Sequence, residues 1–446
     1  MLYRTVLLEE QYVSKLFSAS EGLGPDVPVN RWLQLVAGVA CMVAASNIQY
    51  SWTLFVPAIQ ETHQWSRAAI QTAFTIFVLM QTWSTPLIGH FIDQRGPRTV
   101  VSIGGILIAI AWLVNSQTGS LAGFYVGGAI GGVGVACVYS SCINNALKWF
   151  PDKRGLAVGL TAGGYGAGTI LTIMPIAAMI ENSGYQSAFF VFALIQGAAI
   201  FGLSWFLKAP KGEVGYSTTV AQSRRDYTLV EALKTPVFWV MLAMFTATVT
   251  GGLMAVAQLG PMAKDLGVAD HVIFWGMAAL PLALMLDRLM NGLSRPLFGF
   301  ISDKIGREPT MFIAFSLEAT GIFALAHLGH NPYMFVLLSG VVFIAWGEVY
   351  SLFSATAADV FGTKHIAKIY GVLYTAKGFA ALLVPIGNLL MESTGTWNTV
   401  FYSMSFLDAC AAVCAILVLR PLIRRHHANN EAIRAEPPAA RVVPAQ

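Results

Sequence analysis

The stretch GHFIDQRGPR at residues 89–98 returns in the second half of the chain as GFISDKIGRE at residues 299–308. In both copies a glycine is followed four residues later by an aspartate, and three residues after that by a second glycine. Another pair, WFPDKRGLAVG at 149–159 and VFGTKHIAKIYG at 360–371, follows further along each half. Two loops that recur in the same order predict a chain built from two related halves.

The composition indicates a membrane protein. The 446 residues are 56% hydrophobic and only 11% charged, and they include 42 glycines, which is more glycine than a soluble protein of this size usually carries. The net charge of +4 comes from basic residues spread over many short loops, whereas a nucleic-acid-binding surface gathers them in one patch. The bilayer is therefore the expected partner, and nucleic acid is not.

Twelve apolar stretches are long enough to cross a bilayer, which takes about 20 helical residues. They are residues 32–58, 67–91, 99–117, 121–148, 154–180, 186–207, 236–260, 270–300, 309–328, 333–360, 366–391 and 397–420. We predict an all-α polytopic membrane protein with two six-helix bundles around a central cavity. Thr235 followed by Pro236 is typical of a helix start and places the beginning of the seventh span.

Five parts follow from this pattern. Residues 1–30 are expected to form a cytoplasmic leader, 31–207 the first bundle, 208–235 a cytoplasmic central loop, 236–420 the second bundle and 421–446 a disordered cytoplasmic tail. The leader mixes charged and isolated apolar residues, unlike a cleavable signal peptide. The tail is basic and then rich in alanine, proline and glutamate, a composition that favours disorder.

Loop charges predict the orientation of the chain. Loops after even-numbered spans carry Arg95, Arg98, Lys148, Lys153, Arg154, Lys304, Arg307, Lys364 and Lys368, besides the basic residues of the central loop. Loops after odd-numbered spans carry only Arg67 and Lys264. Because cytoplasmic loops are enriched in lysine and arginine, both termini are expected to be cytoplasmic, in a multi-pass protein of the cell (inner) membrane.

Two basic residues interrupt stretches that otherwise have the composition of membrane-buried helix: Arg295 in LMNGLSRPLFGF and Lys377 in YGVLYTAKGFAALLVP. Each cation costs about 3 kcal/mol at the centre of an inserted helix. Such charges usually face a protein-lined cavity and bind something, so we interpret them as ligands for an anion with two negative ends. The alternative is interhelical salt bridging, with Asp287 and Glu348 as candidate partners.

The internal repeat strengthens the anion interpretation. Aligning the halves places Arg295 opposite Thr85 and Lys377 opposite Tyr165, so only the second half is cationic. A purely structural requirement would more plausibly have placed similar residues in both halves. Arginine presents a planar fork to one carboxylate and lysine a compact charge to another, and a dianion between them would relieve their mutual repulsion. An empty site would then resist closing, which is the behaviour of an obligate exchanger.

Several stretches resemble the oxalate:formate antiporter family of the major facilitator superfamily. They are NIQYSWTLF (47–55), AIQTAFTIF (69–77), WFPDKRGLAVGLTAGGYGAG (149–168), NGLSRPLFGFISDKIGR (291–307), WGEVYSLFSATAADVFGT (346–363) and YTAKG (374–378). The resemblance implies the major facilitator fold and a secondary transporter that exchanges a small dicarboxylate, oxalate, for a monocarboxylate, formate, by alternating access. The alternative on the same fold is a proton-coupled monocarboxylate symporter.

The resemblance also implies a cavity lining. The positions that face the cavity in the family correspond here to Gln49, Tyr50, Gln71, Tyr139, Tyr165, Trp346 and Tyr350. Tyr374, one turn before Lys377, stands where the family has tryptophan, a departure that could widen the slot. Hydroxyls and amides can donate to carboxylate oxygens, but each aromatic residue taken alone also fits ordinary core packing.

The other charged residues of the loops and spans are expected to serve in gating or in ion pairs. Asp93 and Arg95 in the first repeated loop, and Asp303 and Lys304 in the second, are expected to gate the cavity as an inner latch. Asp287, Arg288 and Glu348 lie where the family's type member has no charge. We expect an ion pair of Arg288 with Glu348, or else a carboxylate that couples transport to protons. Glu318 and Asp408 are expected to be structural.

The chain is not expected to be an enzyme. The glycine runs GGAIGGVG (127–134) and GGYGAG (163–168) lie in apolar spans, without the strand and the Lys-Ser/Thr of a phosphate loop; they fit close helix packing. The sequence predicts no metal site, no cofactor and no nucleophile–base set, and a monomer is expected. A polytopic sensor or membrane enzyme remains the alternative from another class.

Overall fold

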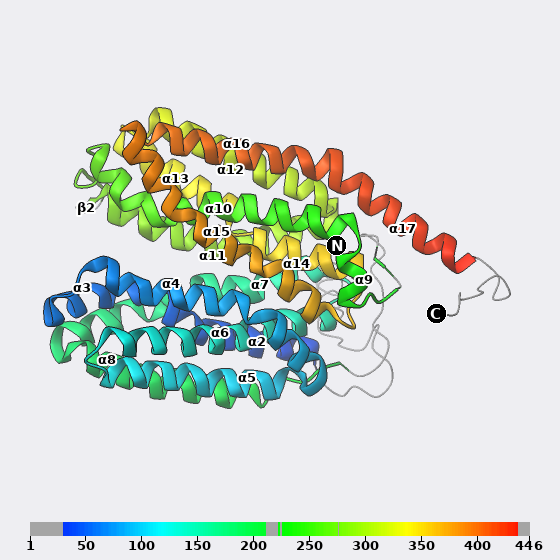
Figure 1. Cartoon of the computed structure of the whole chain (residues 1–446), viewed down its shortest axis with the longest axis horizontal. Helices are drawn as coiled ribbons and strands as arrows, with labels where there is room; N and C mark the ends of the chain where they lie inside the picture. The colour runs from blue at the N-terminus through cyan, green and yellow to red at the C-terminus, as the bar shows by residue number, and fades with distance from the viewer. Residues whose placement is uncertain (1–29, 211–221, 224, 275, 436–446) are drawn as a thin grey trace, which may run out of the picture.

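Two helical bundles lie side by side along their length in the computed structural model, which describes residues 30–210, 222–223, 225–274 and 276–435. The first half of the chain forms the lower bundle in Figure 1 and the second half forms the upper one. The predicted fold class is therefore confirmed. The expected leader falls almost entirely on residues outside this description, as do residues 436–446.

The first bundle contains seven α-helices and one 3-10 turn in the described residues. These are α2 Arg31–Tyr50, α3 Trp52–His63, α4 Arg67–Trp83, α5 Thr85–Gln117, α6 Leu121–Trp149, α7 Arg154–Ala167, η1 Gly168–Leu171 and α8 Ile173–Ser204. Two of them break at a glycine with a positive φ angle, Gly96 (77°) in α5 and Gly184 (79°) in α8. Since only glycine adopts this conformation cheaply, each break separates two spans that were predicted as distinct.

The second bundle begins after a short connecting helix, α9 Leu229–Leu233. Its elements are α10 Pro236–Asp265, β1 Val272–Phe274, β2 Met277–Ala278, α11 Ala279–Ile305, α12 Arg307–Leu328, α13 Pro332–Trp346, α14 Val349–Phe361, α15 Ile366–Thr394, α16 Asn398–Cys414, η2 Ala415–Leu419 and α17 Arg420–Ala435. The Thr235 side chain accepts from the backbone N–H of Phe238 and caps α10, with Pro236 at its first position. The predicted start of the seventh span is confirmed.

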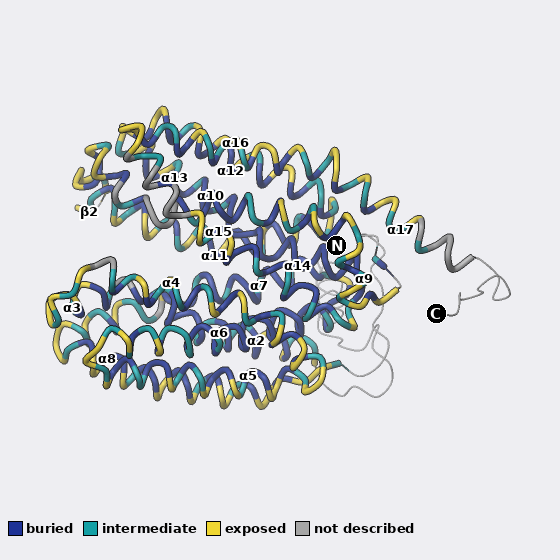
Figure 2. Tube along the Cα trace, in the orientation of Figure 1, coloured by how far each residue is buried: buried dark blue, intermediate teal, exposed yellow. Residues whose placement is uncertain are grey.

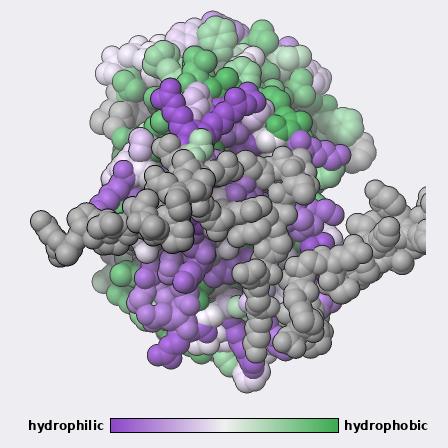
Figure 3. Space-filling view, turned by 90° about the vertical axis from the view of Figure 1, so that its right-hand side faces the viewer, coloured by the Kyte–Doolittle hydropathy of each residue, from purple (hydrophilic) through white to green (hydrophobic). Residues whose placement is uncertain are grey.

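Nine stretches of the described chain are long and apolar enough to cross a membrane. One of them, Arg154–Ser204, includes the break at Gly184, and Ala69–Trp83 is a shorter apolar helix. Helix α11 has the length of a span but carries several charges, including Asp287, Arg288 and Arg295. In Figure 3 hydrophilic residues, coloured purple, gather on the face in view, and hydrophobic residues, coloured green, lie mainly in its upper part.

Two predicted boundaries are wrong. The eighth span was expected from residue 270, but residues 272–278 form the small antiparallel hairpin β1–β2, and α11 begins at Ala279. The tail was expected to be disordered from residue 421, but η2 continues without a break into α17, which ends at Ala435. Its contacts explain why: Tyr227 donates to Asn430 (2.6 Å) and its ring lies 5.0 Å from that of His426.

The central loop contains a helix that was not predicted. Thr228 and Glu231 form a reciprocal capping box around α9, a local device that satisfies backbone N–H groups at a helix start. The hydrogen bonds from the Thr228 backbone and hydroxyl lower the pKa of the Glu231 carboxyl below its ordinary value. Asp226 also accepts from the backbone N–H groups of Thr363 and Lys364, both at 3.0 Å, and so ties this loop to the second bundle.

Glycines allow the two bundles to touch. A Cβ on Gly159 of α7 would lie 2.3 Å from the Arg295 carbonyl oxygen of α11, and one on Gly299 would lie 2.1 Å from the Gly155 oxygen. On the other side, a Cβ on Gly89 of α5 would lie 2.4 Å from the Ala367 oxygen of α15. These glycines come from the duplicated loops or their edges, so the repeated motif places backbone against backbone between the halves.

Replacing Gly159 with alanine is expected to lower the thermal unfolding midpoint of the purified protein, because α7 and α11 must separate to admit the methyl group at a cost of about 1–3 kcal/mol. Gly202→Ala is the matched control: a Cβ at this helical position meets nothing within 4 Å, and alanine favours helix by about 1 kcal/mol. Equal midpoints for the two variants would contradict the close approach of α7 to α11.

Candidate functional site

Helix α11 turns its polar side chains inward. Its buried residues include Asp287, Asn291, Arg295, Gly299 and Ser302, whose spacing of three and four residues lies on one helical face. Large apolar residues on its other faces, such as Leu293 and Leu297, are exposed. The hydropathy of α11 is thus the reverse of a soluble helix, with lipid-facing leucines and a polar interior stripe.

Arg295 is 2% exposed and spans the boundary between the bundles. Its Nη1 donates to the Ala162 carbonyl oxygen of α7 (2.7 Å), and its Nη2 donates to Asn291 Oδ1 one turn earlier (2.9 Å). Both acceptors are uncharged, so they orient the guanidinium without neutralising it. The Nε donor of the same group is buried without a hydrogen-bond partner.

Lys377 is 4% exposed and approaches the boundary from the other side. Its Nζ, on α15, donates to Gln81 Oε1 of α4 (3.1 Å). Gln81 in turn donates to the Tyr165 hydroxyl (3.2 Å), which donates to Gln49 Oε1 (2.7 Å). A chain of neutral polar groups therefore connects Lys377 to three helices of the first bundle.

The ring of Tyr350 is close to both cations. The Arg295 Cζ is 5.0 Å and the Lys377 Nζ 5.8 Å from its centroid, so the two atoms are at most about 11 Å apart. At that separation two like charges repel by about 1.5 kcal/mol at an effective dielectric of 20. Within the described residues neither cation forms an ion pair with a carboxylate, which weakens the salt-bridge alternative considered for them.

Aromatic rings from both bundles surround the cations. The ring centroids of Tyr139 and Tyr374 lie 5.2 Å apart across the boundary, and those of Tyr350 and Tyr374 lie 6.1 Å apart. Further contacts are Tyr50–Tyr165 (5.5 Å), Tyr139–Tyr165 (5.4 Å) and Trp346–Tyr350 (5.8 Å). The dark interior where the bundles meet in Figure 2 agrees with this burial.

The structure brings nearly all the predicted lining residues together. The exception is Gln71, which lies about 15 Å from Gln81 along α4 by helix geometry. The sequence analysis did not identify Gln81, Asn291 or Tyr370 as site residues. The Tyr370 hydroxyl donates to the Tyr350 carbonyl oxygen (3.2 Å). The available signal for Gln81 was an amide within the apolar run TIFVLMQTW.

One end of the boundary is closed by a network centred on two aspartates of the second half. Asp303 accepts from the backbone N–H groups of Gly155 (2.9 Å) and Leu156 (2.8 Å) at the start of α7, and from Arg307 (2.7 Å). An aspartate at a helix start is favoured by both hydrogen bonding and the helix dipole. Here that helix belongs to the other bundle, so Asp303 joins the halves.

Asp359 completes this closure. Its Oδ1 accepts from Arg154 of the first half (2.6 Å) and its Oδ2 from the Arg307 Nε of its own half (2.8 Å), and all three side chains are at most 5% exposed. We call Arg154, Asp303, Arg307 and Asp359 the latch. Only Asp303 was predicted; the others were read as orientation charges or not singled out.

The other predicted gating residues lie outside the latch. Asp93 pairs with Lys148 (3.5 Å) within the first half, and Arg95 is exposed. The Lys304 Nζ lies 4.3 Å from the centroid of the Phe300 ring on its own helix. The first copy of the repeated loop therefore does not reproduce the interbundle bonds that Asp303 makes in the second copy.

The expected ion pair of Arg288 with Glu348 is wrong. The Arg288 Cζ lies 5.0 Å from the centroid of Tyr50, facing the first bundle. Glu348 is 0% exposed, and within the described residues no side chain donates a hydrogen bond to its carboxylate. Helix periodicity had placed Glu348 away from Trp346 and Tyr350, but which neighbour it meets there depends on helix packing that no local pattern encodes.

Two six-helix bundles with an enclosed cationic site between them, and a latch at one end, define a transporter fold of the alternating-access type. A family model described as Major Facilitator Superfamily matches residues 37–385 and 242–444. The chain is 35% identical over 394 residues to the oxalate:formate antiporter of Oxalobacter formigenes, covering 87% of this chain and 92% of that protein. The chain belongs to the major facilitator superfamily and, within it, to the oxalate:formate antiporter family.

Two further similarities are more distant. Monocarboxylate transporter 2 of Meriones unguiculatus is 23% identical over 415 residues, covering 87% of this chain and 84% of that protein. The solved structure of the proton:xylose symporter XylE, with 6-bromo-6-deoxy-D-glucose bound, superposes with a TM-score of 0.67 at 13% identity, covering 87% of this chain and 96% of XylE. This last similarity concerns the fold alone.

Proposed function

We propose that the protein exchanges oxalate for formate across the membrane, with the anion held between Arg295 and Lys377. The observation that carries the proposal is a pair of buried cations that, within the described residues, have only neutral hydrogen-bond partners. Nearby, Arg295 Nε and Trp346 Nε1 are buried donors with no acceptor. Unpaired buried donors are costly, and a carboxylate, which only accepts hydrogen bonds when ionised, would satisfy them.

The two charges suit a dianion. Arg295 offers a fork that binds a carboxylate through two parallel hydrogen bonds, and Lys377 offers a point charge to a second carboxylate. Oxalate between them would cancel their repulsion and draw α11 and α15 toward the first bundle. Formate would fill one position only, bind more weakly and leave readily, which suits the exchanged product. The similarity to the oxalate:formate antiporter of Oxalobacter formigenes supports the same assignment.

The remaining lining would set selectivity. Gln49 and Gln81 supply amides, while Tyr50, Tyr139, Tyr165, Trp346, Tyr350 and Tyr374 restrict the width of the site. We extend the proposal to the lining role of Gln71 and to gating by Asp93, Arg95, Asp303 and Lys304. We also propose that the latch end faces the cytoplasm of the cell (inner) membrane, with both termini on that side, and that each chain works as a monomer because one chain contains the whole site.

A second candidate function is symport of a monocarboxylate with protons. Fully buried carboxylates in the second bundle, Glu348 among them, favour it, as does the similarity to monocarboxylate transporter 2. In this alternative a carboxylate would carry the proton while Arg295 holds the single carboxylate of the substrate.

Counterflow into proteoliposomes separates the two functions. We expect labelled oxalate to enter only vesicles preloaded with oxalate or formate, and unlabelled anions to compete in the order oxalate, malonate, then acetate or lactate, because monocarboxylates satisfy one cation only. Empty vesicles provide the control. Uptake into empty vesicles driven by a pH gradient alone, or stronger competition by acetate or lactate than by oxalate, would overturn the exchange proposal in favour of symport.

A further inference from the structure

Three carboxylates from different elements of the second bundle lie buried near one another. They are Glu318 on α12, Asp408 on α16 and Glu348 at the break between α13 and α14, and each is 0% exposed. Helices α12 and α16 touch here, because the Ser405 hydroxyl donates to the Ala319 carbonyl oxygen (2.8 Å), and Glu348 is near enough to Glu318 and Asp408 for an electrostatic interaction. We call these three residues the carboxylate cluster.

Among the described residues, no side chain donates a hydrogen bond to any of the six carboxylate oxygens of this cluster; only the backbone N–H groups of Glu348 and Val349 approach the Glu348 carboxylate. An ionised carboxylate in such a place would lose its hydration without compensation, and three neighbouring negative charges would also repel one another. Burial of this kind is tolerated when the groups carry protons or bind a cation. In the described chain no group of His, Cys, Asp or Glu side chains converges as metal ligands would, so a proton is the ligand that fits this arrangement.

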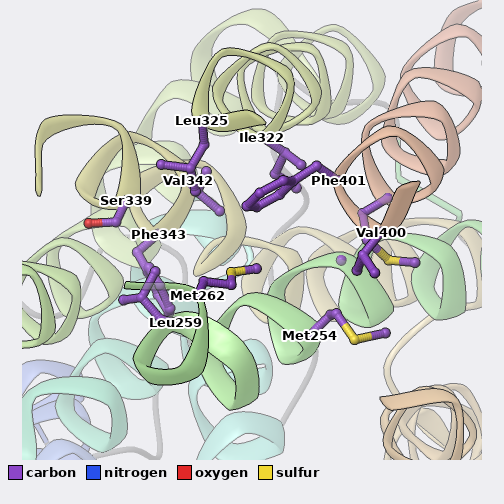
Figure 4. Close-up of a pocket in the computed structure, with 12 residues that line it drawn as sticks. Met254, Leu259, Met262, Ile322, Leu325, Ser339, Val342, Phe343, Val400 and Phe401 are labelled. Atoms are coloured by element: carbon purple, nitrogen blue, oxygen red, sulfur yellow. The ribbon is translucent and has the colours of Figure 1, made fainter. Parts of the chain in front are cut away.

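Among the residues that the structure describes, the surfaces next to the cluster offer it one compensating positive charge. A small pocket beside it, shown in Figure 4, is lined by apolar side chains and Ser339. Its wall includes Ile322, one turn after Glu318, and Met404, one turn before Asp408. From α10 the cluster meets Gly251, where a Cβ would lie 2.8 Å from Asp408 Oδ2. The missing side chain leaves room for the carboxylate but supplies no partner.

That charge belongs to Arg295. Glu348 follows Gly347, the residue after the end of α13, and lies near enough to Arg295 for an electrostatic interaction. A Cβ on Gly347 would lie 2.1 Å from Ser294 Oγ and 2.6 Å from the Asn291 oxygen, so the break packs directly against the part of α11 that carries Arg295. Tyr350, two residues after Glu348, has its ring centroid 5.0 Å from the Arg295 Cζ.

We infer that Glu318, Glu348 and Asp408 form a proton-binding cluster, and that its protonation, transmitted through Glu348, controls how strongly Arg295 holds its anion. When Glu348 is ionised it partly neutralises Arg295, and the anion binds less tightly. When Glu348 is protonated, the full charge of Arg295 is available to the anion. The proton-binding part stands on the cluster itself, whereas the link to the anion rests on the proposed function.

The direction of the coupling is fixed by this charge balance. Oxalate is expected to bind more tightly as the pH falls. Because the proton and oxalate must change each other's binding constant by the same factor, oxalate binding is also expected to make the protein take up protons. Carboxylic acids in water stay ionised between about pH 6 and about pH 8. We expect the oxalate KM at about pH 6 to be about fivefold or more lower than at about pH 8, which is a modest coupling between two binding sites.

The first experiment tests the cluster without transport. Infrared spectra of the purified protein at neutral pH are expected to show the carbonyl stretch of protonated carboxylic acids. The triple variant Glu318→Gln, Glu348→Gln, Asp408→Asn should lose most of that signal, and each single variant part of it. The amides keep the shape and remove the repulsion, so the variants are expected to fold. Asp287→Asn is the matched control, because it removes a buried carboxylate of α11 that is not part of the cluster. This variant should keep most of the signal.

The second experiment measures the oxalate KM against pH in proteoliposomes for the parent, Glu348→Gln and Asp287→Asn. We expect Glu348→Gln to hold the low-pH affinity at every pH and Asp287→Asn to keep the parent's dependence. A pH-independent parent, or a dependence abolished by Asp287→Asn and kept by Glu348→Gln, would overturn the coupling. An undiminished infrared signal in the triple variant would overturn the cluster even if exchange is normal. A parent that shows the signal but no oxalate exchange at any pH would overturn the proposed function and leave the cluster standing.

Discussion

Replacing Arg295 with lysine is expected to reduce the kcat/KM for oxalate exchange by more than about 100-fold, although the charge is kept. The guanidinium is held by the Ala162 carbonyl oxygen and Asn291 Oδ1, which aim its remaining donors at the centre of the site. Lysine is a point charge without a fork. Two charge-assisted hydrogen bonds of about 1.5–3 kcal/mol each are then lost, and each 1.4 kcal/mol is about tenfold.

Lys377→Ala is expected to have a loss of the same order, because it removes the second charge and leaves Gln81 without its donor. Arg425→Lys is the matched control for Arg295→Lys, because it replaces arginine with lysine at an exposed position on α17. This variant should exchange oxalate normally. Folding is checked by the elution profile and thermal unfolding of each purified variant. Near-normal exchange by a folded variant of Arg295 or Lys377 would remove the two-cation site.

Substitution of Asp359 with asparagine is expected to open the latch. Asp359 is 2% exposed and bridges Arg154 and Arg307, each within 2.8 Å. Removing its charge leaves the buried Arg154 guanidinium without a carboxylate partner among the described residues and leaves Arg307 with Asp303 alone. Breaking a buried pair in this way costs about 3–5 kcal/mol. Since Arg154 belongs to the other half of the chain, the substitution destabilises the conformation in which this end is closed.

The readout is hydrogen exchange at the start of α7. The backbone N–H groups of Gly155 and Leu156 donate to Asp303 only while the latch is closed, so their exchange should become faster in Asp359→Asn. Asp152→Asn is the matched control. Its carboxylate pairs with Arg31 at 2.9 Å, but it is 40% exposed, and pairs of that kind contribute little. Unchanged exchange at both amides in Asp359→Asn would show that Asp359 does not hold the halves together.

The cluster and the latch act at different places on the same boundary. The cluster lies within the second bundle behind Arg295, whereas the latch joins α7 to residues of the second half at the loop end. A proton on Glu348 would therefore change the affinity of the central site, and the loss of Asp359 would change how often that end is closed. Measuring affinity and amide exchange in the same variants distinguishes these two effects.

The sequence by itself determined the spans, the twofold repeat and the two cations. Hydropathy over about 20 residues decides whether a helix can cross a bilayer, and the cap formed by Thr235 depends only on its neighbours in the chain. Charges within apolar stretches, Arg295 and Lys377, are visible for the same reason. The boundary errors at residues 270 and 421 arose where the chain leaves the apolar region and hydropathy no longer distinguishes helix from hairpin or loop.

Only the tertiary structure decided which charges meet. Gln81 reaches Lys377, and Arg154 reaches Asp359, across hundreds of residues, and the three cluster carboxylates come from separate elements. The mistaken pairing of Arg288 with Glu348 has the same origin. A helical repeat fixes which face of a helix a side chain occupies, but the rotation and register of that helix against its neighbours follow from packing of the whole bundle, here set by glycines such as Gly159 and Gly347 that let particular backbones touch.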